Sequence, residues 1–228
     1  MDYSDIELWK TQSLRDEMEY FGLPLRRSRA DMIDAILEAK DASYVRGGQL
    51  GEAGKDAITY SVNKKYALKQ YKPRKSAQSI TKEAALQRRL AEVRVCPKVI
   101  DVDTRRKYIL MEKLDKHMFD INSEKRISAD HQKQLIKLYE RMDSAGVFHG
   151  DANPLNYMTK GKKLYVIDFG MSKEITPKLI KQLDTDRPNR HIMTLGMVLK
   201  MKAMNFPRSS YEHLLPALKQ EHVGSLGL

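Results

Sequence analysis

The sequence has a single cysteine, no cluster of cysteine and histidine, and no long apolar run, and each absence excludes a class of protein. One cysteine, Cys96, cannot form a disulfide framework within the chain and is typical of a reducing compartment. Without a Cys/His cluster, a structural zinc site is not expected. No apolar stretch approaches the length of a membrane span, and the acidic, polar first residues are unlike a signal peptide. We therefore expect an intracellular protein with no membrane partner.

Positive charge is in excess, and it is unevenly distributed. Residues 1–42 carry six Lys and Arg against ten Asp and Glu, a net charge of −4. The remaining residues carry 35 against 20, a net charge of +15. Such a basic surface suits an acidic protein, a nucleic acid or a nucleotide as partner, and a basic surface that is simply solvated is an equal alternative. A chain of 228 residues is long enough for one or two domains with a sizeable core.

Residues 149–170 hold the densest group of potential catalytic side chains. His149, Asp151 and Asn156 form the pattern His-x-Asp-x-x-x-x-Asn, and the triplet Asp-Phe-Gly begins twelve residues after Asn156, at Asp168. A turn signal, Lys-Gly, and an apolar strand lie between them, which predicts a short hairpin with Asn156 and Asp168 at its two ends. A carboxylate such as Asp151 can accept the proton of an attacking hydroxyl, and Mg²⁺ prefers oxygen ligands such as Asn156 and Asp168.

This pattern resembles the catalytic loop and metal-binding motif of the protein-kinase superfamily. The resemblance implies ATP as phosphoryl donor and Mg²⁺ as cofactor. It also implies that Asp151 orients and deprotonates the acceptor, and that Asn156 and Asp168 hold the metal. Upstream, the strand Tyr-Ala-Leu-Lys resembles the kinase strand whose lysine holds the phosphates, which would be Lys69.

Lys69 needs an acidic partner on the helix that follows it. We assign Glu83, and Glu92 at the far end of that helix is the weaker alternative. Ser79 or Thr81 would cap the helix, because either side chain can accept a hydrogen bond from a free amide of the first turn.

The remaining parts of a nucleotide site follow from the same resemblance. Gly51 and Gly54 lie between two predicted strands, where a phosphate loop belongs, although the full Gly-x-Gly-x-x-Gly is absent and a plain hairpin turn is the alternative. Met111 would guard the back of the adenine pocket, and the backbone groups of Glu112 and Leu114 would face the adenine edge. A simple core strand is compatible with both roles.

The N-terminal segment predicts two short helices. Leu14, Met18 and Phe21 recur at helical spacing, and the first helix ends at Gly22. The second helix begins after Ser28 and carries its own apolar stripe. Residues between the helices read Gly-Leu-Pro, and the whole pattern resembles a SAP motif.

The SAP resemblance covers roughly residues 8–39 and implies DNA as a possible partner. Arg26, Arg27 and Arg29 cluster in the turn, where phosphate contacts would be expected. The net negative charge of the segment opposes nonspecific affinity for DNA. A helical hairpin that packs on the kinase-like part or on a protein partner is the competing interpretation.

The segment after the metal motif is short. A helix is predicted from Ser128 to Ala145, in the kinase order of elements, but only 58 residues follow Gly170 and no Ala-Pro-Glu occurs. The architecture is similar to minimal atypical kinases, such as the RIO type and the small kinase of the tRNA-threonylcarbamoylation complex. His191-Ile-Met-Thr-Leu-Gly resembles the kinase helix Asp-x-Trp-x-Leu-Gly, with His191 at the position of the aspartate that braces the catalytic loop.

The sequence thus predicts an α+β, two-lobed, protein-kinase-like fold with a reduced C-terminal lobe, preceded by a small helix-extended-helix module. The predicted domains are residues 1–42, 43–114 and 115–228. The predicted activity is ATP- and Mg²⁺-dependent phosphoryl transfer to Ser or Thr hydroxyls of an unidentified protein substrate. A small-molecule phosphotransferase of the aminoglycoside or choline type is one alternative, and an ATPase switch or nucleotide-binding scaffold is another.

Overall fold

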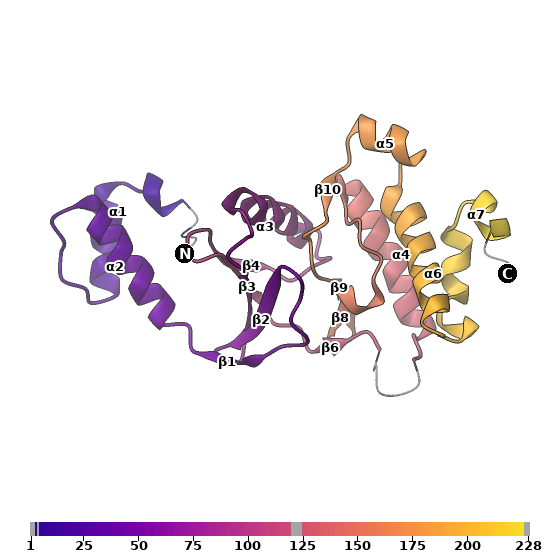
Figure 1. Ribbon diagram of the computed structural model, residues 1–228, viewed down its shortest axis with the longest axis horizontal. Helices are drawn as coiled ribbons and strands as arrows, with labels where there is room; N and C mark the ends of the chain where they lie inside the picture. The colour runs from indigo at the N-terminus through magenta and orange to yellow at the C-terminus, as the bar shows by residue number, and fades with distance from the viewer. Residues whose placement is uncertain (1–2, 4, 120–124, 226–228) are drawn as a thin grey trace. The chain divides into compact units, whose positions relative to one another are not determined.

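The computed structural model describes residues 3, 5–119 and 125–225, and the chain divides into two compact units (Figure 1). The first unit comprises residues 1–81 and 99–113, and the second comprises residues 82–98 and 114–228. Helix α3 (Ala77–Glu92) begins in the first unit and ends in the second. Each unit combines helices with antiparallel strands, and each is described by itself below.

The first unit is built on a five-stranded antiparallel sheet with the order β1-β2-β3-β5-β4. Val62, Leu68, Tyr108 and Leu110 form a buried cluster on this sheet. β3 is central because it pairs with β2 on one side and with β5 on the other. The strands are β1 (Arg46–Gln49), β2 (Ala57–Val62), β3 (Tyr66–Tyr71), β4 (Val99–Asp103) and β5 (Tyr108–Glu112).

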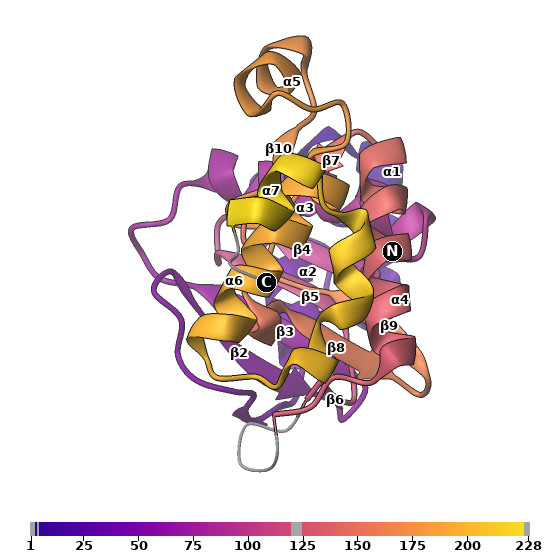
Figure 2. The same cartoon turned by 90° about the vertical axis from the view of Figure 1, so that its right-hand side faces the viewer.

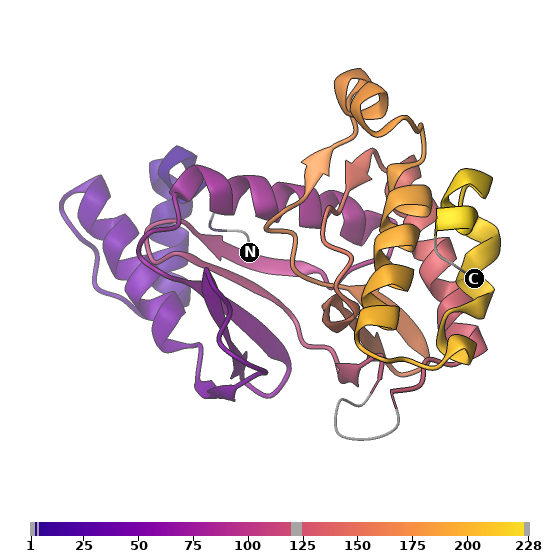
Figure 3. The same ribbon diagram turned by 45° about the vertical axis from the view of Figure 1, so that its right-hand side comes forward.

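A helical module precedes the sheet within the same unit (Figure 3). It consists of η1 (Ile6–Leu8), α1 (Thr11–Tyr20) and α2 (Arg29–Ala42). Leu14 and Met18 of α1 are buried against an apolar stripe of α2, and Ser28 caps α2 by accepting from the amide of Asp31 at 3.0 Å. Gly22 has φ +64°, as a left-handed helix end requires. The two predicted helices, their apolar faces and the cap of the second are confirmed.

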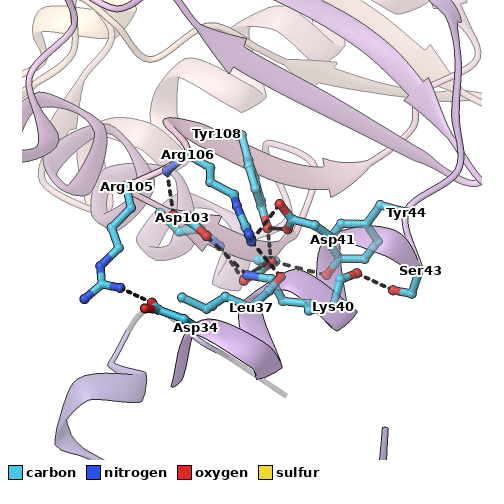
Figure 4. A network of polar contacts seen from close by, with 12 residues as sticks. Asp34, Leu37, Lys40, Asp41, Ser43, Tyr44, Asp103, Arg105, Arg106 and Tyr108 are labelled. Atoms are coloured by element: carbon cyan, nitrogen blue, oxygen red, sulfur yellow. Dashed lines mark hydrogen bonds and ion pairs between the residues drawn. The ribbon is translucent and has the colours of Figure 1, made fainter. Parts of the chain in front are cut away.

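Buried polar contacts join this module to the sheet (Figure 4). The ammonium of Lys40 lies 2.9 Å from the carboxylate of Asp101 and 3.6 Å from that of Asp103, and its side chain is only 2% exposed. The hydroxyl of Tyr108 donates to Asp101 at 2.8 Å and lies 3.0 Å from Asp41. Burial raises the pKa of the Asp41 carboxyl above its ordinary value, and the hydrogen bond from Tyr108 opposes that rise.

The turn between β4 and β5 adds two arginines to the same interface. Arg106 pairs with Asp41 at 2.8 Å and donates to the backbone oxygen of Leu37 at 2.6 Å. Arg105 pairs with Asp34 at 3.0 Å and also with Glu7. The two arginines thus contact three residues of α2 and one residue of η1. The module is therefore packed on the sheet through these contacts rather than connected to it by a free linker.

Helix α3 begins earlier than the sequence suggested. Its first residue is Ala77, and the hydroxyl oxygen of Ser76 accepts from the amide of Ser79 at 3.2 Å. The prediction that Ser79 or Thr81 caps this helix is therefore wrong, since both lie inside it. Glu83 consequently sits in the second turn, where its side chain is buried.

The second unit has one large apolar core beneath short strands and helices. α4 (Ala129–Ser144) supplies Leu135, Leu138 and Met142 to that core, and Ser128 caps it by accepting from the amide of His131. The predicted helix is thereby confirmed. Two small sheets have the orders β6-β8-β9 and β10-β7. The strands are β6 (Lys116–His117), β7 (Val147–Phe148), β8 (Tyr157–Lys160), β9 (Lys163–Val166) and β10 (Lys173–Glu174).

The C-terminal part of this unit is mostly helical (Figure 2). η4 and η5 pack against α4, and η5 also contacts α6. None of the helices in the described part of the chain is long and apolar enough to cross a membrane. The elements are η2 (Pro154–Asn156), α5 (Pro177–Leu183), η3 (Asn189–Met193, a π-helical turn), α6 (Thr194–Ala203), η4 (Arg208–Ser210), η5 (Glu212–Ala217) and α7 (Gln220–Ser225).

Candidate active site

The hairpin β8–β9 brings two predicted metal ligands to the same end of a small sheet. Tyr157 pairs with Val166, and the backbone oxygen of Asn156 accepts from the amide of Ile167 at 2.9 Å. The turn is tight because Gly161 adopts φ +59° and donates its amide to Asp115. In this register Asp168 follows one residue beyond the pair that contains Asn156. The predicted hairpin is thus present, with Asn156 and Asp168 at its ends.

The side chain of Asn156 is held by Asp151. Its amide nitrogen donates to Asp151 Oδ2 at 2.9 Å, and the asparagine is buried. The second oxygen, Asp151 Oδ1, lies 3.7 Å from Nζ of Lys200 on α6. The Asp151 side chain is 27% exposed, so the carboxylate is oriented by two neighbours and still open to solvent.

Asp168 has a backbone conformation that few residues adopt. Its φ is +66°, in the left-handed region where aspartate is tolerated better than most side chains. The next residue, Phe169, is buried and packs edge-to-face on the ring of His149, with 5.2 Å between ring centroids. This anchored phenylalanine fixes the chain immediately after the carboxylate.

His149 links the candidate catalytic loop, residues 149–156, to the segment after β9 that carries Asp168. Nε2 lies 3.0 Å from the backbone oxygen of Ile167, and the amide of Asp151 lies 3.3 Å from Nδ1. Nδ1 also lies 3.1 Å from the backbone oxygen of Asp151. A neutral ring that donates from Nε2 and accepts at Nδ1 satisfies the contacts with Ile167 and with the amide of Asp151. Burial lowers the pKa of His149 below its ordinary value, because a charged imidazole would lose its hydration. The uncharged imidazole therefore stabilises the loop through hydrogen bonds.

A buried asparagine that the sequence analysis missed braces the same loop. Asn189 accepts from the amide of His149 at 3.0 Å and donates to the backbone oxygen of Val147 at 2.7 Å. It also donates to Asp143 at 2.7 Å, and Asp143 accepts from the amides of Asn189 and Arg190. Burial raises the pKa of Asp143, and these hydrogen bonds oppose the rise.

The sequence left open whether His191 substitutes for the bracing aspartate or whether that match is misaligned, and the contact with the loop backbone belongs to Asn189. The Nδ1 of His191 lies 2.6 Å from the hydroxyl of Thr185, whereas Asn189, two residues earlier, contacts the loop backbone. The sequence signal for the correct residue was weak, because a π-helical turn shifts the start of this helix relative to the kinase pattern.

Two glycines allow close backbone approach at the catalytic loop. Gly150 has φ +81°, and a Cβ there would lie 3.0 Å from the backbone oxygen of Met171. A Cβ on Gly196 of α6 would lie 2.8 Å from the Cβ of Ala152. Gly150 stands where many kinases have an arginine, and both the backbone conformation and the space exclude that side chain here.

In the first unit, the predicted phosphate-holding lysine lies in the middle of the sheet. Lys69 on β3 is opposite Thr59 and Ile109, and its ammonium lies 5.5 Å from the centre of the Tyr71 ring. Glu83 belongs to the second unit, so its pairing with Lys69 stays a prediction. Glu92, the alternative partner, is the last residue of α3.

The predicted nucleotide-contacting residues fall into both units. Gly51 and Gly54 lie in the loop between β1 and β2, and Gly51 has φ +68°. Met111 and Glu112 are on β5 of the first unit, whereas Leu114 belongs to the second. Their roles toward adenine and phosphate stay predictions.

The three arginines proposed for nucleic acid do not have equal surroundings. Arg26 and Arg27 are exposed in the loop between α1 and α2. Arg29 instead donates to the backbone oxygen of Glu7 at 2.8 Å and to that of Trp9. It therefore holds η1 onto the start of α2.

The donor set at the hairpin suits a hard divalent cation. The nitrogen of Asn156 is engaged by Asp151, so its amide oxygen is the atom that can serve as a ligand. Mg²⁺ commonly binds through one or two protein oxygens together with phosphates and water, and Asn156 with Asp168 meets that requirement. No group of three or more His, Cys, Asp and Glu able to hold a metal occurs among residues 3, 5–119 and 125–225.

Comparison with known proteins identifies the class. The RIO domain family matches residues 53–189, more than half of the chain. The chain belongs to this family of atypical kinases, and the predicted atypical, kinase-like α+β fold is confirmed.

A curated relative is the KEOPS complex subunit Bud32 of Pyrococcus abyssi (strain GE5 / Orsay). It is 29% identical over 120 residues, which cover 49% of this chain and 53% of the relative. The chain thus spans about half the length of the curated relative that it matches.

Proposed function

We propose that this protein is an ATP- and Mg²⁺-dependent protein kinase that phosphorylates Ser or Thr hydroxyls. One observation carries the proposal. Asp151 is held by Asn156 at 2.9 Å, and Asn156 shares one end of the β8–β9 hairpin with Asp168. A proton acceptor in the preceding loop is thereby held by a residue at the end of a hairpin whose two ends carry the proposed oxygen ligands, an arrangement that suits phosphoryl transfer.

Each residue of this site has a definite task in the proposed reaction. Asp151 orients the acceptor hydroxyl and takes its proton as the oxygen attacks the terminal phosphorus. Asn156 keeps the carboxylate in position and, with Asp168, would hold Mg²⁺. When bound with ATP, Mg²⁺ supplies neutralisation of the charge on the phosphates. Lys69 holds the remaining phosphates, with Glu83 as its proposed partner.

The decisive experiment measures transfer of label from γ-labelled ATP in the presence of Mg²⁺. Protein-bound label and free phosphate are scored separately for wild type, Asp168→Ala and the control Asp186→Ala. Asp186 is an exposed carboxylate of the same unit outside the proposed site. Label on protein that disappears with Asp168→Ala and survives with Asp186→Ala supports the kinase.

Two results would contradict the proposal. Free phosphate without labelled protein, even when candidate protein substrates are supplied, favours an ATPase switch. Label that persists in Asp168→Ala would show that the Asp168 carboxylate is not required for the transfer. A small-molecule acceptor is tested in the same assay by adding aminoglycosides or choline in place of protein.

The comparison with a subunit of a protein complex supports a protein partner for this chain. We propose that the kinase acts within a protein assembly, as the name of the archaeal relative indicates for that protein. Mixing the purified chain with candidate partners and measuring labelled phosphate per molecule tests the idea. Activity that is unchanged by every candidate would count against it.

The N-terminal module supports a second, separate proposal, which is contact with DNA through Arg26 and Arg27. Both guanidinium groups are exposed in the loop of the SAP-like pattern, whereas Arg29 serves the fold. Binding of the full chain to a labelled duplex, measured against salt, should weaken in the double variant Arg26→Gln/Arg27→Gln. The exposed Arg15 on α1 offers a matched control, and equal loss with Arg15→Gln would remove the loop as the site.

A further inference from the structure

A lysine beyond the matched family region points at the proposed catalytic carboxylate. Lys200 lies on α6, outside residues 53–189, and its ammonium is 3.7 Å from Asp151 Oδ1. The other oxygen of the same carboxylate takes the hydrogen bond from Asn156. Asp151 thus has a neutral donor on one oxygen and a cation near the other.

The position of Lys200 follows from the packing of α6. Gly196 has no side chain, so the helix approaches the catalytic loop at Ala152 more closely than any Cβ would permit. Lys200 is four residues later and therefore lies on the same face of the helix, one turn further along. Met197 and Met201 are fully buried on the core side and fix the rotation of the helix.

The ion pair is weak enough to exchange for a ligand. The distance is near the outer limit for an ion pair, and the Lys200 side chain is 50% exposed. Exposed pairs of this kind contribute little to folding because solvent screens them. A flexible, half-exposed ammonium next to a proton acceptor can therefore turn toward an incoming anion without disrupting the core.

The catalytic loop itself supplies no cation at the place where many protein kinases have a lysine. Asn153 occupies that position, and its side-chain oxygen accepts from the amide of Leu155 at 3.1 Å. Phosphoryl transfer spreads negative charge over the oxygens of the moving group, and a positively charged donor beside them stabilises that charge. In this chain the ammonium beside Asp151 is that of Lys200, which lies on α6.

We propose that Lys200 is a catalytic residue that binds an oxygen of the terminal phosphoryl group of ATP. This inference rests on the proposed kinase function. A bond forms between the acceptor oxygen and the γ-phosphorus, and the bond from that phosphorus to the β–γ bridging oxygen breaks. Asp151 takes the acceptor proton, ADP leaves with the bonding electron pair, and Lys200 keeps its proton throughout. Before ATP binds, Lys200 pairs with Asp151.

The test compares Lys200→Met with Lys200→Arg and with the control Lys137→Met. Lys137 is an exposed lysine on α4 of the same unit, so its replacement removes the same charge away from the site. Affinities for ADP and for a non-hydrolysable ATP analogue are measured by calorimetry, with Mg²⁺ present. Transfer of label from γ-labelled ATP is measured in parallel.

A contact with the terminal phosphoryl group predicts a selective loss. Lys200→Met should weaken the ATP analogue about tenfold and leave ADP within about twofold, because only the analogue carries the third phosphate. Label transfer should fall about 100-fold. Lys200→Arg should retain most of both, and Lys137→Met should match wild type.

The outcomes separate this inference from the proposed function. If the wild type transfers label and Lys200→Met behaves like the wild type, only the role of Lys200 is overturned and the proposed kinase activity stands. Equal weakening of both nucleotides also overturns the role of Lys200, since a general loss of charge or fold would do the same. If the wild type never transfers label, the proposed kinase activity is refuted. If Lys200→Met nevertheless binds the ATP analogue more weakly and ADP as before, the contact between Lys200 and the terminal phosphate is retained. Wild type that binds neither nucleotide refutes both.

Discussion

The strongest test of how the first unit is held together is Lys40→Met. The Lys40 side chain is almost completely buried between Asp101 and Asp103, and its ammonium also lies 4.9 Å and 5.3 Å from the ring centres of Tyr3 and Tyr108. Methionine keeps most of the volume and removes the charge. The two aspartates then lose their cation inside the interface shown in Figure 4.

Removal of one partner from a buried ion pair costs about 3–5 kcal/mol, because the remaining charge stays without compensation. The lower end is expected here, since Asp101 keeps hydrogen bonds from the hydroxyls of Tyr44 at 3.2 Å and Tyr108 at 2.8 Å. A loss of about 3 kcal/mol corresponds to a decrease of roughly 1–3 M in the urea midpoint of a unit of this size.

The assay is urea denaturation followed by the fluorescence of the single tryptophan. Trp9 packs against the core of the module, 5.5 Å from the ring of Tyr3, so it reports the element that carries Lys40. Lys10→Met is the control, because Lys10 is an exposed lysine of the same module and its loss should change stability by less than about 0.5 kcal/mol.

Equal shifts of the urea midpoint by Lys40→Met and Lys10→Met would contradict the stabilising role of the buried Lys40 ion pair. A second variant tests the cause of any loss. Asp101→Asn in the Lys40→Met background removes one uncompensated charge, so it should recover part of the stability. A further loss of stability in the double variant would show that the charge balance is not what Lys40 supplies.

The catalytic loop of the second unit offers three more tests. Because burial lowers the pKa of His149 below its ordinary 6.5, the unfolded chain binds the proton first as pH falls. The contribution of the neutral His149 to the free energy of unfolding is therefore fully present above pH 6.5. It is lost as the pH falls below 6.5, by up to about 1.4 kcal/mol per pH unit. Urea midpoints at pH 7.5 and 5.5 should differ for wild type and differ less for His149→Gln; an equal difference would remove His149 as the cause. Asn189→Ala leaves buried backbone groups unpaired and should cost about 2–3 kcal/mol by urea denaturation, with a loss below 1 kcal/mol arguing against the bracing role. Gly150→Ala should destabilise by about 1–3 kcal/mol, because its Cβ would meet the oxygen of Met171 in a left-handed backbone. Gly161→Ala, which has a similar φ and no atom within 4 Å of the added Cβ, should cost less in the same thermal or urea melt, and equal costs would exclude the contact as the cause.

The sequence determined those features that depend on neighbouring residues. The hairpin with Asn156 and Asp168 at its ends was predictable because a turn signal and an apolar strand set its register over a few residues. The cap of α2 by Ser28 was predictable for the same reason, since an N-cap contact spans three residues. The resemblance to kinases likewise rested on residues within one local segment, residues 149–170.

Local sequence signals also left two contacts incorrectly or incompletely assigned. Ser76, Ser79 and Thr81 can all cap a helix by residue type, and it is the hydroxyl of Ser76 that accepts from the amide of Ser79. His191 matched a helix pattern, but a π-helical turn moved the loop contact to Asn189. In both cases more than one residue near the helix start is compatible with the local sequence pattern.

Tertiary structure alone decided the contacts between segments far apart in the chain. Lys200 reaches Asp151 because Gly196 lets α6 approach the loop, and Lys40 reaches Asp101 because the module packs on the turn between β4 and β5. No pattern of neighbouring residues encodes either pair, since each depends on which faces two separately formed elements bury against each other. The charges that orient the proposed catalytic carboxylate and fasten the N-terminal module are therefore properties of the packed fold.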